Sequence, residues 1–357
     1  MAPEDRSAPL GIVFVSSHAR NGGAERYLEA LFDVLGPKWI RMVVCLEEGP
    51  LAERLRRSRP TEVIPTSGRW TSIVGSAWRL RRLLRETKPD LVHANGIKAA
   101  IASLIAATGL RTPVVWVRHD FSFDGRIARL VARRCRLTIG VSEAVARGLT
   151  RASVVHTATP ALGEATTVEL GLPKGARVVS LVGYFHPLKG QLELVETAPA
   201  VLARVPEAQF LFVGGEDPSA AGYLELVRAR TRELGLEDSV KFLGHRPDAI
   251  DVLRASDVSV VLTLGHGEGF GLAALESLAV GTPVVGYASG ALPEIVADSG
   301  KLVRAGDRTG LAAAVVEVLA DPALREQLSA RGRARAREEF SLENWADGMI
   351  EAYREAA

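Results

Sequence analysis

The sequence predicts an α/β protein built from two parallel sheets, because three of its features agree. Short apolar runs rich in Val and Ile alternate with longer helical patterns along the chain, which is typical of buried strands joined by crossover helices. The length of 357 residues suits two domains at roughly 100–200 residues each. The charge balance also changes near the middle of the chain, which indicates two units with different surfaces.

The candidate strands fall into two groups separated by a looser stretch. The first group comprises GIVFVSS (from Gly11), RMVVCL (Arg41), TEVIP (Thr61), DLVHAN (Asp90), PVVWVRHD (Pro113) and LTIGVS (Leu137). The second group comprises RVVSLVGYF (from Arg177), QFLFVGGE (Gln209), SVKFLG (Ser239), VSVVLTL (Val258) and TPVVGY (Thr282). Each group predicts one parallel sheet with helices between its strands.

The domain boundary is expected in the loose stretch between Thr157 and Leu172. Residues 1–163 carry 25 Lys and Arg against 14 Asp and Glu, a net +11, whereas the remainder carries 19 against 28, a net −9. We therefore expect one α/β domain over residues 1–163 and a second over residues 173–340. The last segment is expected to be a helix with Ser341 as its N-cap.

The cysteines and the hydropathy pattern predict a cytoplasmic protein. Cys45 and Cys135 have no metal-ligand spacing, and two isolated cysteines favour a reducing compartment. No apolar run reaches the length of a membrane span, and the start of the chain lacks the pattern of a signal peptide.

Two arginine-rich segments leave two interpretations open. The segments SAWRLRRLLRETK (from Ser76) and GRIARLVARRCRL (from Gly125) both predict basic amphipathic helices. Such helices can dock on an anionic membrane that carries a lipid-linked acceptor. They can equally be ordinary surface helices whose apolar stripe packs on the sheet. We favour the second interpretation, because the core needs that stripe.

Polar clusters directly follow many of the predicted strands, and ligands bind beyond the carboxyl ends of strands in open parallel sheets. We therefore expect one cleft between two facing α/β units. Glycine loops open onto helices at Gly23 and at Gly271, where backbone N–H groups suit phosphate, although a tight turn explains such glycines equally well. Neither loop matches a dinucleotide fingerprint or a P-loop. Lys189 would add a positive charge beside phosphates.

The sequence offers no metal site, and we expect no metal and no other cofactor. There is no Asp-x-Asp, no His-x-x-x-His and no cysteine pair. A diphosphate bound here would be neutralised by Lys and Arg side chains and by helix dipoles instead of a cation.

At this point a family resemblance becomes visible. EGFGLAALESLAVGTPVVGYASGALPEIV, from Glu268, resembles the Glu-x7-Glu signature of family 4 of the retaining glycosyltransferases, also called glycosyl transferases group 1, which have the GT-B fold. The pieces NGGAER, PDLVHANG, VRHDF, LVGYFHPLKG, VKFLGHRPDAIDVLRASDVSVVL and FSLENWADGMIEAY are similar to family segments in the same order. The resemblance spans essentially the whole chain, and its specific part is the run from Glu268 to Val296.

The resemblance implies two facing Rossmann-like domains, an acceptor-binding one over 1–163 and a nucleotide-sugar-binding one over 173–340. It also implies that 341–357 forms a closing helix on the first domain. Glu276 would bind the donor's ribose, and a carboxylate suits a vicinal diol. Glu268 and His119 would contact the transferred sugar.

The resemblance also implies how the donor's diphosphate and base are held. Lys189 would neutralise the departing diphosphate, and the loop from Gly244 to Arg246 would hold the base. Further donor contacts are implied for Gly269, Phe270, Gly271, Leu272, Gly23 and Gly183.

The sequence departs from the family pattern at two places. Tyr184 follows Gly183 where family members usually carry a phosphate-binding arginine, and Arg118, His186 or Arg246 are candidates to replace that cation. The loop before Glu268 is longer than usual and contains His266, which has no family role. Glu25 and Arg26 are further candidates for acceptor contact, although their place in the first turn of a predicted helix explains their charge equally well.

The resulting hypothesis is a retaining, metal-independent glycosyltransferase that moves a sugar from a nucleoside diphosphate sugar, expected to be a UDP-sugar, to a hydroxyl acceptor. The acceptor is expected to be a glycan, a lipid-linked molecule or a small molecule, and no nucleic acid is expected. One alternative is a GT-B-like nucleotide-sugar epimerase or hydrolase. Another is a non-catalytic nucleotide-sugar-binding partner of a glycosyltransferase complex.

Overall fold

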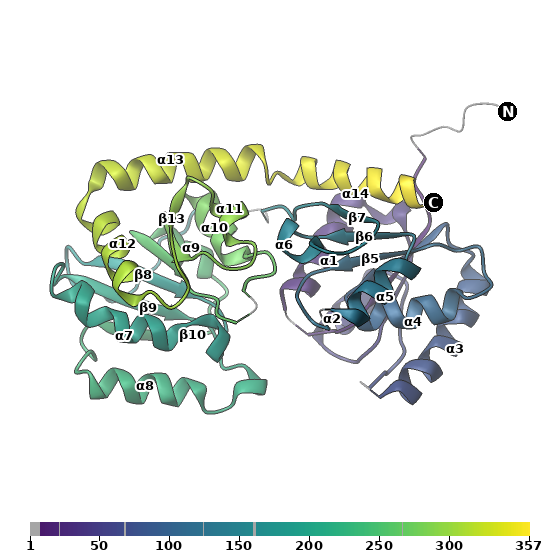
Figure 1. The fold of residues 1–357 in the computed structure, drawn as a ribbon, viewed down its shortest axis with the longest axis horizontal. Coiled ribbons are helices and arrows are strands. Elements are labelled where there is room, and N and C mark those ends of the chain that lie inside the picture. Colours follow the sequence, from purple (N-terminus) through teal and green to yellow (C-terminus); the bar gives the residue numbers. More distant parts are fainter. Residues whose placement is uncertain (1–7, 21, 68, 124, 160–161, 266) are drawn as a thin grey trace. The chain divides into compact units, whose positions relative to one another are not determined.

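The computed structural model describes the chain apart from residues 1–7, 21, 68, 124, 160–161 and 266. The chain divides into two compact units. Unit 1 comprises Met1–Ala158 together with Leu342–Ala357, and unit 2 comprises Thr159–Ser341. Each unit contains one parallel sheet flanked by helices (Figure 1), so the predicted fold class of two Rossmann-like domains is confirmed.

Unit 1 contains a seven-stranded parallel sheet with the order β3-β2-β1-β4-β5-β6-β7. Its strands are β1 (Ile12–Ser16), β2 (Ile40–Cys45), β3 (Thr61–Val63), β4 (Leu91–Asn95), β5 (Val114–Arg118), β6 (Leu137–Gly140) and β7 (Ala152–Val154). Its helices are α1 (Gly23–Leu35), α2 (Pro50–Arg56), α3 (Trp70–Thr87), α4 (Ile97–Ala107), α5 (Arg126–Arg134), α6 (Glu143–Ala146) and α14 (Leu342–Ala356), with a 3-10 turn at Pro37–Trp39.

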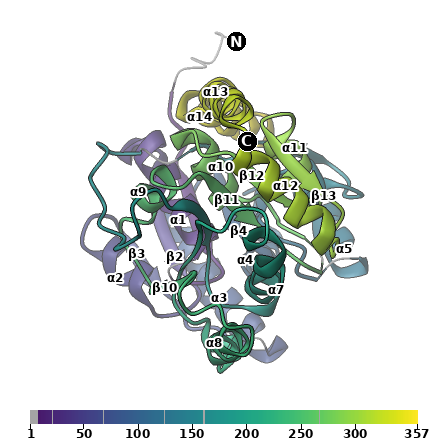
Figure 2. The ribbon, with the colours of Figure 1, turned by 90° about the vertical axis from the view of Figure 1, so that its left-hand side faces the viewer.

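Unit 2 contains a six-stranded parallel sheet with the order β10-β9-β8-β11-β12-β13. Its strands are β8 (Arg177–Val182), β9 (Ala208–Val213), β10 (Val240–Gly244), β11 (Val258–Val261), β12 (Val284–Tyr287) and β13 (Gly300–Val303). Its helices are α7 (Gln191–Leu202), α8 (Tyr223–Glu233), α9 (Ala249–Arg254), α10 (Leu272–Val280), α11 (Leu292–Val296), α12 (Arg308–Ala320) and α13 (Pro322–Glu338), with 3-10 turns at Pro187–Lys189 and Pro218–Ala220. Helix α10 lies against β11 and β12 (Figure 2).

The sequence missed two strands, β7 and β13, which form one edge of each sheet. Strand β7 has only three residues, and β13 begins with a glycine followed by a lysine. Neither contains a fully buried residue. Because edge strands bury little apolar surface, they lack the continuous apolar run by which the central strands can be recognised.

The parallel register places polar residues side by side at the carboxyl ends of the central strands. In unit 1, Ser16 at the end of β1 pairs with Asn95 at the end of β4, and Asn95 pairs with Val117 of β5. In unit 2, β8 and β11 are also neighbours, and their pair Ser180 and Ser259 lies inside the sheet and not at its carboxyl end. The loops after these strands therefore emerge next to one another within each unit.

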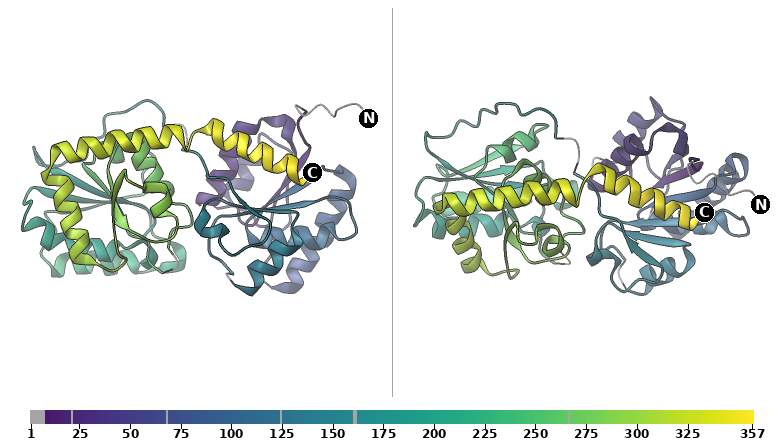
Figure 3. Two further views of the ribbon diagram at one scale, coloured as in Figure 1. Left: turned by 45° about the horizontal axis from the view of Figure 1, so that its top comes forward. Right: turned by 90° about the horizontal axis from the view of Figure 1, so that it is seen from above.

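The C-terminal helix α14 packs on unit 1 and follows α13 directly along the chain (Figure 3). Three large side chains of α14, Trp345, Met349 and Tyr353, are buried. The hydroxyl of Tyr27 donates to the sulfur of Met349 at 3.3 Å. The hydroxyl of Tyr353 lies 2.6 Å from Nδ1 of the buried His93 in β4, so α14 contributes core to unit 1.

We expect Tyr353→Ala to lower the free energy of unfolding of unit 1 by about 3–5 kcal/mol, because it removes a fully buried aromatic side chain. Tyr353→Phe should cost about 1–3 kcal/mol, because it takes away the hydroxyl partner of His93. All five tryptophans lie in unit 1, so tryptophan fluorescence during urea unfolding reports on this unit. Tyr184→Ala, at an exposed position in unit 2, is the control. A loss below about 1 kcal/mol for Tyr353→Ala would show that α14 is not part of the core.

Candidate functional site

Glu268 and Lys189 form an ion pair at the carboxyl end of the unit 2 sheet. Nζ of Lys189 donates to Oε2 of Glu268 at 2.8 Å, and Oγ1 of Thr263 donates to the same oxygen at 2.7 Å. The Glu268 side chain is 19% exposed and that of Lys189 is 37% exposed. The structure thus brings together two residues that the sequence singled out 79 positions apart.

Close backbone packing positions Glu268. The amide of Ala291 donates to the carbonyl of Glu268 at 2.8 Å. A Cβ on Gly290, which has φ 55°, would lie 2.1 Å from that carbonyl oxygen. A Cβ on Gly267 would lie 2.4 Å from the amide nitrogen of Gly290. The two segments can approach this closely only because glycine occupies both places.

Lys189 is positioned by the same loop from the other side. It ends the 3-10 turn at Pro187–Lys189 after β8, and the amide of Leu264 donates to the carbonyl of Leu188 at 2.8 Å. Gly190 follows with φ 72°, where a Cβ would lie 2.5 Å from Cβ of Leu262. Gly183 lies nearby, since its Cβ would sit 4.0 Å from Cγ and Cδ of Lys189.

The ion pair fixes the charge state of Glu268. Burial by itself would raise the pKa of Glu268, but the charge of Lys189 and hydrogen bonds from Lys189 and Thr263 outweigh burial and hold that pKa below its ordinary value. The side chain is therefore a carboxylate at neutral pH, able to stabilise nearby positive charge but not to donate a proton.

Helix α10 begins directly after this loop and carries Glu276. Its N-cap, Gly271, has φ 100°, and a Cβ there would lie 3.1 Å from Cδ2 of Leu292 and 3.3 Å from Cγ of Glu268. The first amides of a helix have no intrahelical partner, and those of Leu272 and its successors start beside Glu268. Glu276 is only 6% exposed, and a carboxylate that is buried this far is uncommon unless it is paired. The spacing of eight therefore places one acid in the loop and one on the helix that follows it.

The remaining unit 2 candidates lie on neighbouring loops. Phe270 is buried, with its ring 6.0 Å from that of Phe340. Gly244 ends β10 with φ 68° at an exposed position. Tyr184 occupies the position at which family members usually have an arginine. Its side chain is 42% exposed, and its carbonyl accepts a hydrogen bond from Nε2 of Gln191 at 2.7 Å. His266 lies outside the described residues.

Each candidate replacement for the missing arginine has a local partner. Arg246 forms a two-point ion pair with Asp248, at 2.8 and 2.5 Å. Nδ1 of His186 accepts from the amide of Leu188 at 3.1 Å. Arg118 is buried in unit 1, where it donates to the carbonyl of Val145 at 2.8 Å. Lys189 is thus the cation that the structure places nearest to Glu268.

Unit 1 has a pocket of about 480 Å³ at the carboxyl end of its sheet, lined by both polar and apolar residues, which we call the polar pocket because of its many polar side chains. His119 lines it, and Nε2 of His119 lies 2.6 Å from Oδ1 of Asn95. Glu25 also lines the pocket and is buried, close enough to Gly22 that a Cβ there would lie 2.5 Å from its carboxylate. Gly23 begins α1 and is exposed.

Several residues at these two places were not singled out from the sequence. In unit 2 they are Thr263 and Gly290, and in unit 1 they are Asn95, Glu47 and Lys98, which line the polar pocket. Asn95 could have been found from its place at a strand end in DLVHAN. Glu47 and Lys98 carry no distinctive local pattern.

His93 in β4 and His119, which directly follows β5, are both neutral at pH 7. Burial lowers the pKa of His93 to about 3 and that of His119 to about 4, the latter partly offset by Asp120. His119 can therefore donate or accept a hydrogen bond but carries no positive charge at neutral pH.

This burial predicts a pH-dependent stability of unit 1. The unfolded chain binds a proton at His93 near pH 6.5, whereas the folded chain does so only near pH 3. The stabilising contribution is therefore complete above pH 6.5 and is lost as the pH falls through this window. We expect His93→Phe to reduce the drop in unfolding free energy between about pH 7.5 and about pH 5 by ~1–2 kcal/mol. Urea unfolding followed by tryptophan fluorescence measures it, and identical pH profiles for both proteins would contradict the assignment.

The part of the chain that the structure describes contains no group of three or more His, Cys, Asp or Glu side chains that could hold a metal ion. A search of the same residues finds no helix that is both long enough and apolar enough to cross a membrane.

Comparison with known proteins places this architecture in a family. The model of Glycosyltransferase Family 4 matches residues 21–159, and the model described as Glycosyl transferases group 1 matches residues 176–321. Together the two matches cover most of the chain. The chain therefore belongs to glycosyltransferase family 4 and has the GT-B fold.

Particular relatives agree with this placement. The D-inositol 3-phosphate glycosyltransferase of Rhodococcus erythropolis is 32% identical over 75% of this chain and 63% of its own length. The N-acetyl-alpha-D-glucosaminyl L-malate synthase of Bacillus anthracis is 31% identical over 49% of this chain and 44% of its own length. The chain thus spans less than two thirds of the curated relatives that it matches. The crystal structure of Anabaena HepE in complex with UDP and glucose has a TM-score of 0.83, with 23% identity over 96% of this chain and 98% of that one.

Proposed function

We propose that the protein is a retaining glycosyltransferase that transfers a sugar from a nucleoside diphosphate sugar to a hydroxyl acceptor. The observation that carries the proposal is the contact of Lys189 with Glu268, next to the start of the helix that bears Glu276. The Lys189 cation and the helix N-terminal amides suit a diphosphate, and the two carboxylates suit the hydroxyls of a sugar and of a ribose.

The ion pair suggests how donor binding prepares the site. Without donor, Lys189 neutralises Glu268. A bound diphosphate would compete for the Lys189 ammonium and leave the Glu268 carboxylate facing the sugar. As the bond from the anomeric carbon to the phosphate oxygen breaks, its electrons pass to the diphosphate. Lys189 would then stabilise the negative charge that develops there, and Glu268 the positive charge on the ring.

Retention and metal independence are parts of the proposal with separate support. In a front-face route, the departing phosphate takes the proton of the acceptor hydroxyl on the face from which it leaves, so the site needs no covalent carboxylate nucleophile. The low pKa of Glu268 suits a charge-stabilising role. Lys189 supplies the positive charge that a cation would otherwise bring.

The donor nucleotide is proposed to be UDP, because the related HepE structure holds UDP. The acceptor stays open as to class, because the two relatives named above differ in the acceptor that their names give. Donor contacts of Glu276, Gly269, Phe270, Gly271, Leu272, Gly183, Gly244 and Arg246, and those of His119 and Gly23 in unit 1, belong to the same proposal. Cytoplasmic location also belongs to it, supported by the two buried free thiols of Cys45 and Cys135.

A thermal-shift comparison of UDP, GDP, ADP and dTDP tests the donor assignment. A ligand at 100 times its dissociation constant stabilises its site by about 2.7 kcal/mol, so we expect a clear rise in melting temperature with UDP alone. The rise should be unchanged by EDTA. A response to none of the four nucleotides would contradict the proposal, and a rise that requires a divalent cation would contradict metal independence.

A further inference from the structure

Three neighbouring helices of unit 1 carry large apolar side chains that its core does not bury. On α3, Trp70, Val74 and Trp78 are 62%, 42% and 70% exposed. They are four residues apart, so they lie on one face of the helix. Helices α3, α4 and α5 lie side by side (Figure 1). We call the outer apolar face the exposed set on these helices, Trp70, Val74, Trp78, Ile105, Ile127 and Leu130.

This face is distinct from the stripe that packs on the sheet. On α3, the core takes Ile73, Ala77, Leu80, Leu83 and Leu84. On α5, the core takes only the buried residues Ala128, Val131 and Ala132. The core therefore explains one apolar stripe on α3 and one on α5, as the sequence led us to expect, and leaves the outer apolar face unexplained.

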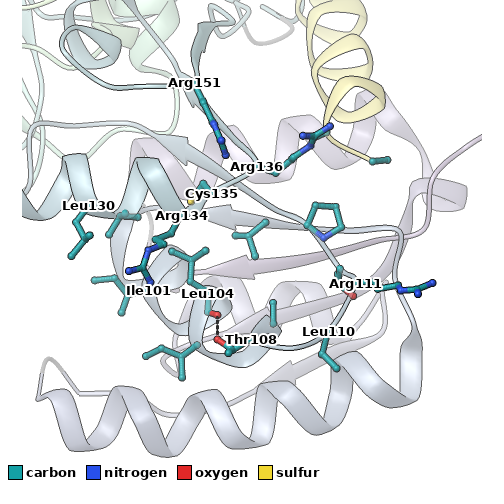
Figure 4. A pocket seen from close by; sticks show the side chains of 18 of the residues that line it. Ile101, Leu104, Thr108, Leu110, Arg111, Leu130, Arg134, Cys135, Arg136 and Arg151 are labelled. Carbon is teal, nitrogen blue, oxygen red and sulfur yellow. Dashed lines mark hydrogen bonds between the residues drawn. The ribbon is translucent and has the colours of Figure 1, made fainter.

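A groove of about 900 Å³ runs through the outer apolar face (Figure 4). Its lining includes Ile101, Leu104, Leu110 and Leu130, and the figure shows arginines around these apolar side chains. These arginines are Arg111, Arg134, Arg136 and Arg151. Within the described chain none of the four guanidinium groups has an ion-pair partner, whereas most arginines of unit 2 pair with carboxylates.

The excess positive charge of unit 1 is concentrated in the segment that contains these three helices. Residues 69–151, which include α3, α4 and α5, carry 16 Lys and Arg against 5 Asp and Glu, a net +11. Residues 1–68 carry nine of each sign and are neutral. The excess positive charge of the first half of the chain therefore lies in the segment that also carries the outer apolar face.

We propose that the outer apolar face docks on an anionic lipid bilayer. Tryptophan favours the boundary between headgroups and hydrocarbon, and Ile and Leu side chains can enter the acyl region. Each Lys or Arg near an anionic membrane is attracted by the negative charge of its headgroups. The arginines without ion-pair partners therefore suit the anionic headgroups, and the apolar side chains beside them suit the acyl region.

Other occupants fit the same face less well. A second copy of the chain would bring two strongly positive surfaces together, and like charges across an interface are unfavourable. A water-soluble small ligand would use the groove alone and leave Val74 and Trp78, which do not line it, without a role. A bilayer covers groove, tryptophans and arginines at once.

The position of the face connects it with the acceptor. The groove shares Trp70, Ile101 and Ile127 with the polar pocket that contains His119 and Asn95. A docked bilayer would therefore present headgroups at the edge of that pocket. Together with the proposed function, on which this step rests, the geometry favours a lipid-linked acceptor.

Sedimentation with vesicles tests the docking, without donor or acceptor. The vesicles are phosphatidylcholine alone or an equimolar mixture with phosphatidylglycerol. We expect binding to the mixed vesicles, weaker at high salt because screening shortens the range of the charges. Trp78→Ser/Leu130→Ser and Arg134→Glu/Arg136→Glu should each lower the partition coefficient at least about tenfold, which corresponds to ~1.4 kcal/mol.

The matched controls lie in unit 2. Leu226→Ser removes an equally exposed leucine, and Arg204→Glu/Arg232→Glu makes the same change in net charge at exposed positions. Both should leave partitioning within about twofold of the unchanged protein, a difference below ~0.5 kcal/mol. Circular dichroism shows whether each variant is folded.

Several results would overturn the docking proposal. They are absence of binding to mixed vesicles, equal loss in the controls, and a change of oligomeric state in place of vesicle binding. Binding of a dispersed short-chain phosphatidylglycerol without vesicle binding would make the groove a pocket for single lipids and also overturn it. Nucleotide binding is measured separately, so failure of docking and failure of the donor assignment are distinguishable.

Discussion

Replacing Glu268 by glutamine is expected to lower kcat for sugar transfer by about 10²–10³, the size of effect seen when one preorganised electrostatic contact to a transition state is removed. The substitution keeps the shape of the side chain but removes the charge that holds Lys189 at 2.8 Å. Because glutamine cannot stabilise positive charge on the sugar ring, the loss should fall on kcat more than on KM. Release of UDP from UDP-glucose, with or without acceptor, measures it.

Asp257→Asn is the matched control for this variant. Asp257 is 20% exposed, close to the value for Glu268, and it also pairs with cations, Arg177 and Arg325. It precedes β11 at the opposite, amino end of the sheet. The Asp257→Asn variant should therefore be less stable but should keep its turnover. If Glu268→Gln kept full turnover, Glu268 would not act in the reaction, and a non-catalytic binding role would become the better account.

Glu276→Gln is expected to weaken UDP binding about 10- to 100-fold, because hydrogen bonds to a charged group contribute roughly 1.5–3 kcal/mol. The carboxylate is buried on α10, so its orientation towards a ribose would be fixed before the donor arrives. Isothermal titration calorimetry with UDP measures the change in Kd.

The control for Glu276 is Glu196→Gln. Glu196, like Glu276, lies on a helix of unit 2, and its side chain is 19% exposed. It pairs with Arg230 and Arg308 on the surface formed by α7, α8 and α12. Its substitution should leave UDP affinity unchanged. Equal weakening by both variants would show that loss of charge in unit 2, and not a contact from Glu276, sets the affinity.

The central parts of the fold could be predicted from the sequence because they follow from burial. Strands such as Ile12–Ser16 are buried at every position, which produces the continuous apolar runs that periodicity detects. The edge strands β7 and β13 could not be predicted because they are short and half-exposed. The exposed stripe on α3 could not be predicted because the sequence shows that Trp70 and Trp78 are apolar but does not show whether other side chains cover them.

Lys189, Glu268 and Glu276 could be singled out from the sequence because each stands in a motif that resembles the family pattern, but their contacts could not. Glu268 and Glu276 are eight residues apart, and a loop followed by a helix start fixes both. Lys189 and Thr263 reach the same carboxylate from separate loops, and their distances depend on packing between Gly190, Leu262 and Gly290. The contact of Lys189 with Glu268 joins segments 79 residues apart and leaves no local pattern in the sequence.

The most direct test of the account is calorimetry of UDP and UDP-glucose on the unchanged protein, Glu268→Gln and Glu276→Gln. The account assigns Glu276 to the nucleotide and Glu268 to the sugar. It predicts that Glu276→Gln weakens both ligands equally. Glu268→Gln should not weaken UDP binding, because it frees Lys189 for the diphosphate, but it should remove the increment that glucose adds. If Glu268→Gln weakened UDP as much as UDP-glucose, or if neither ligand bound the unchanged protein, the proposed division of the donor between the two acids would be wrong.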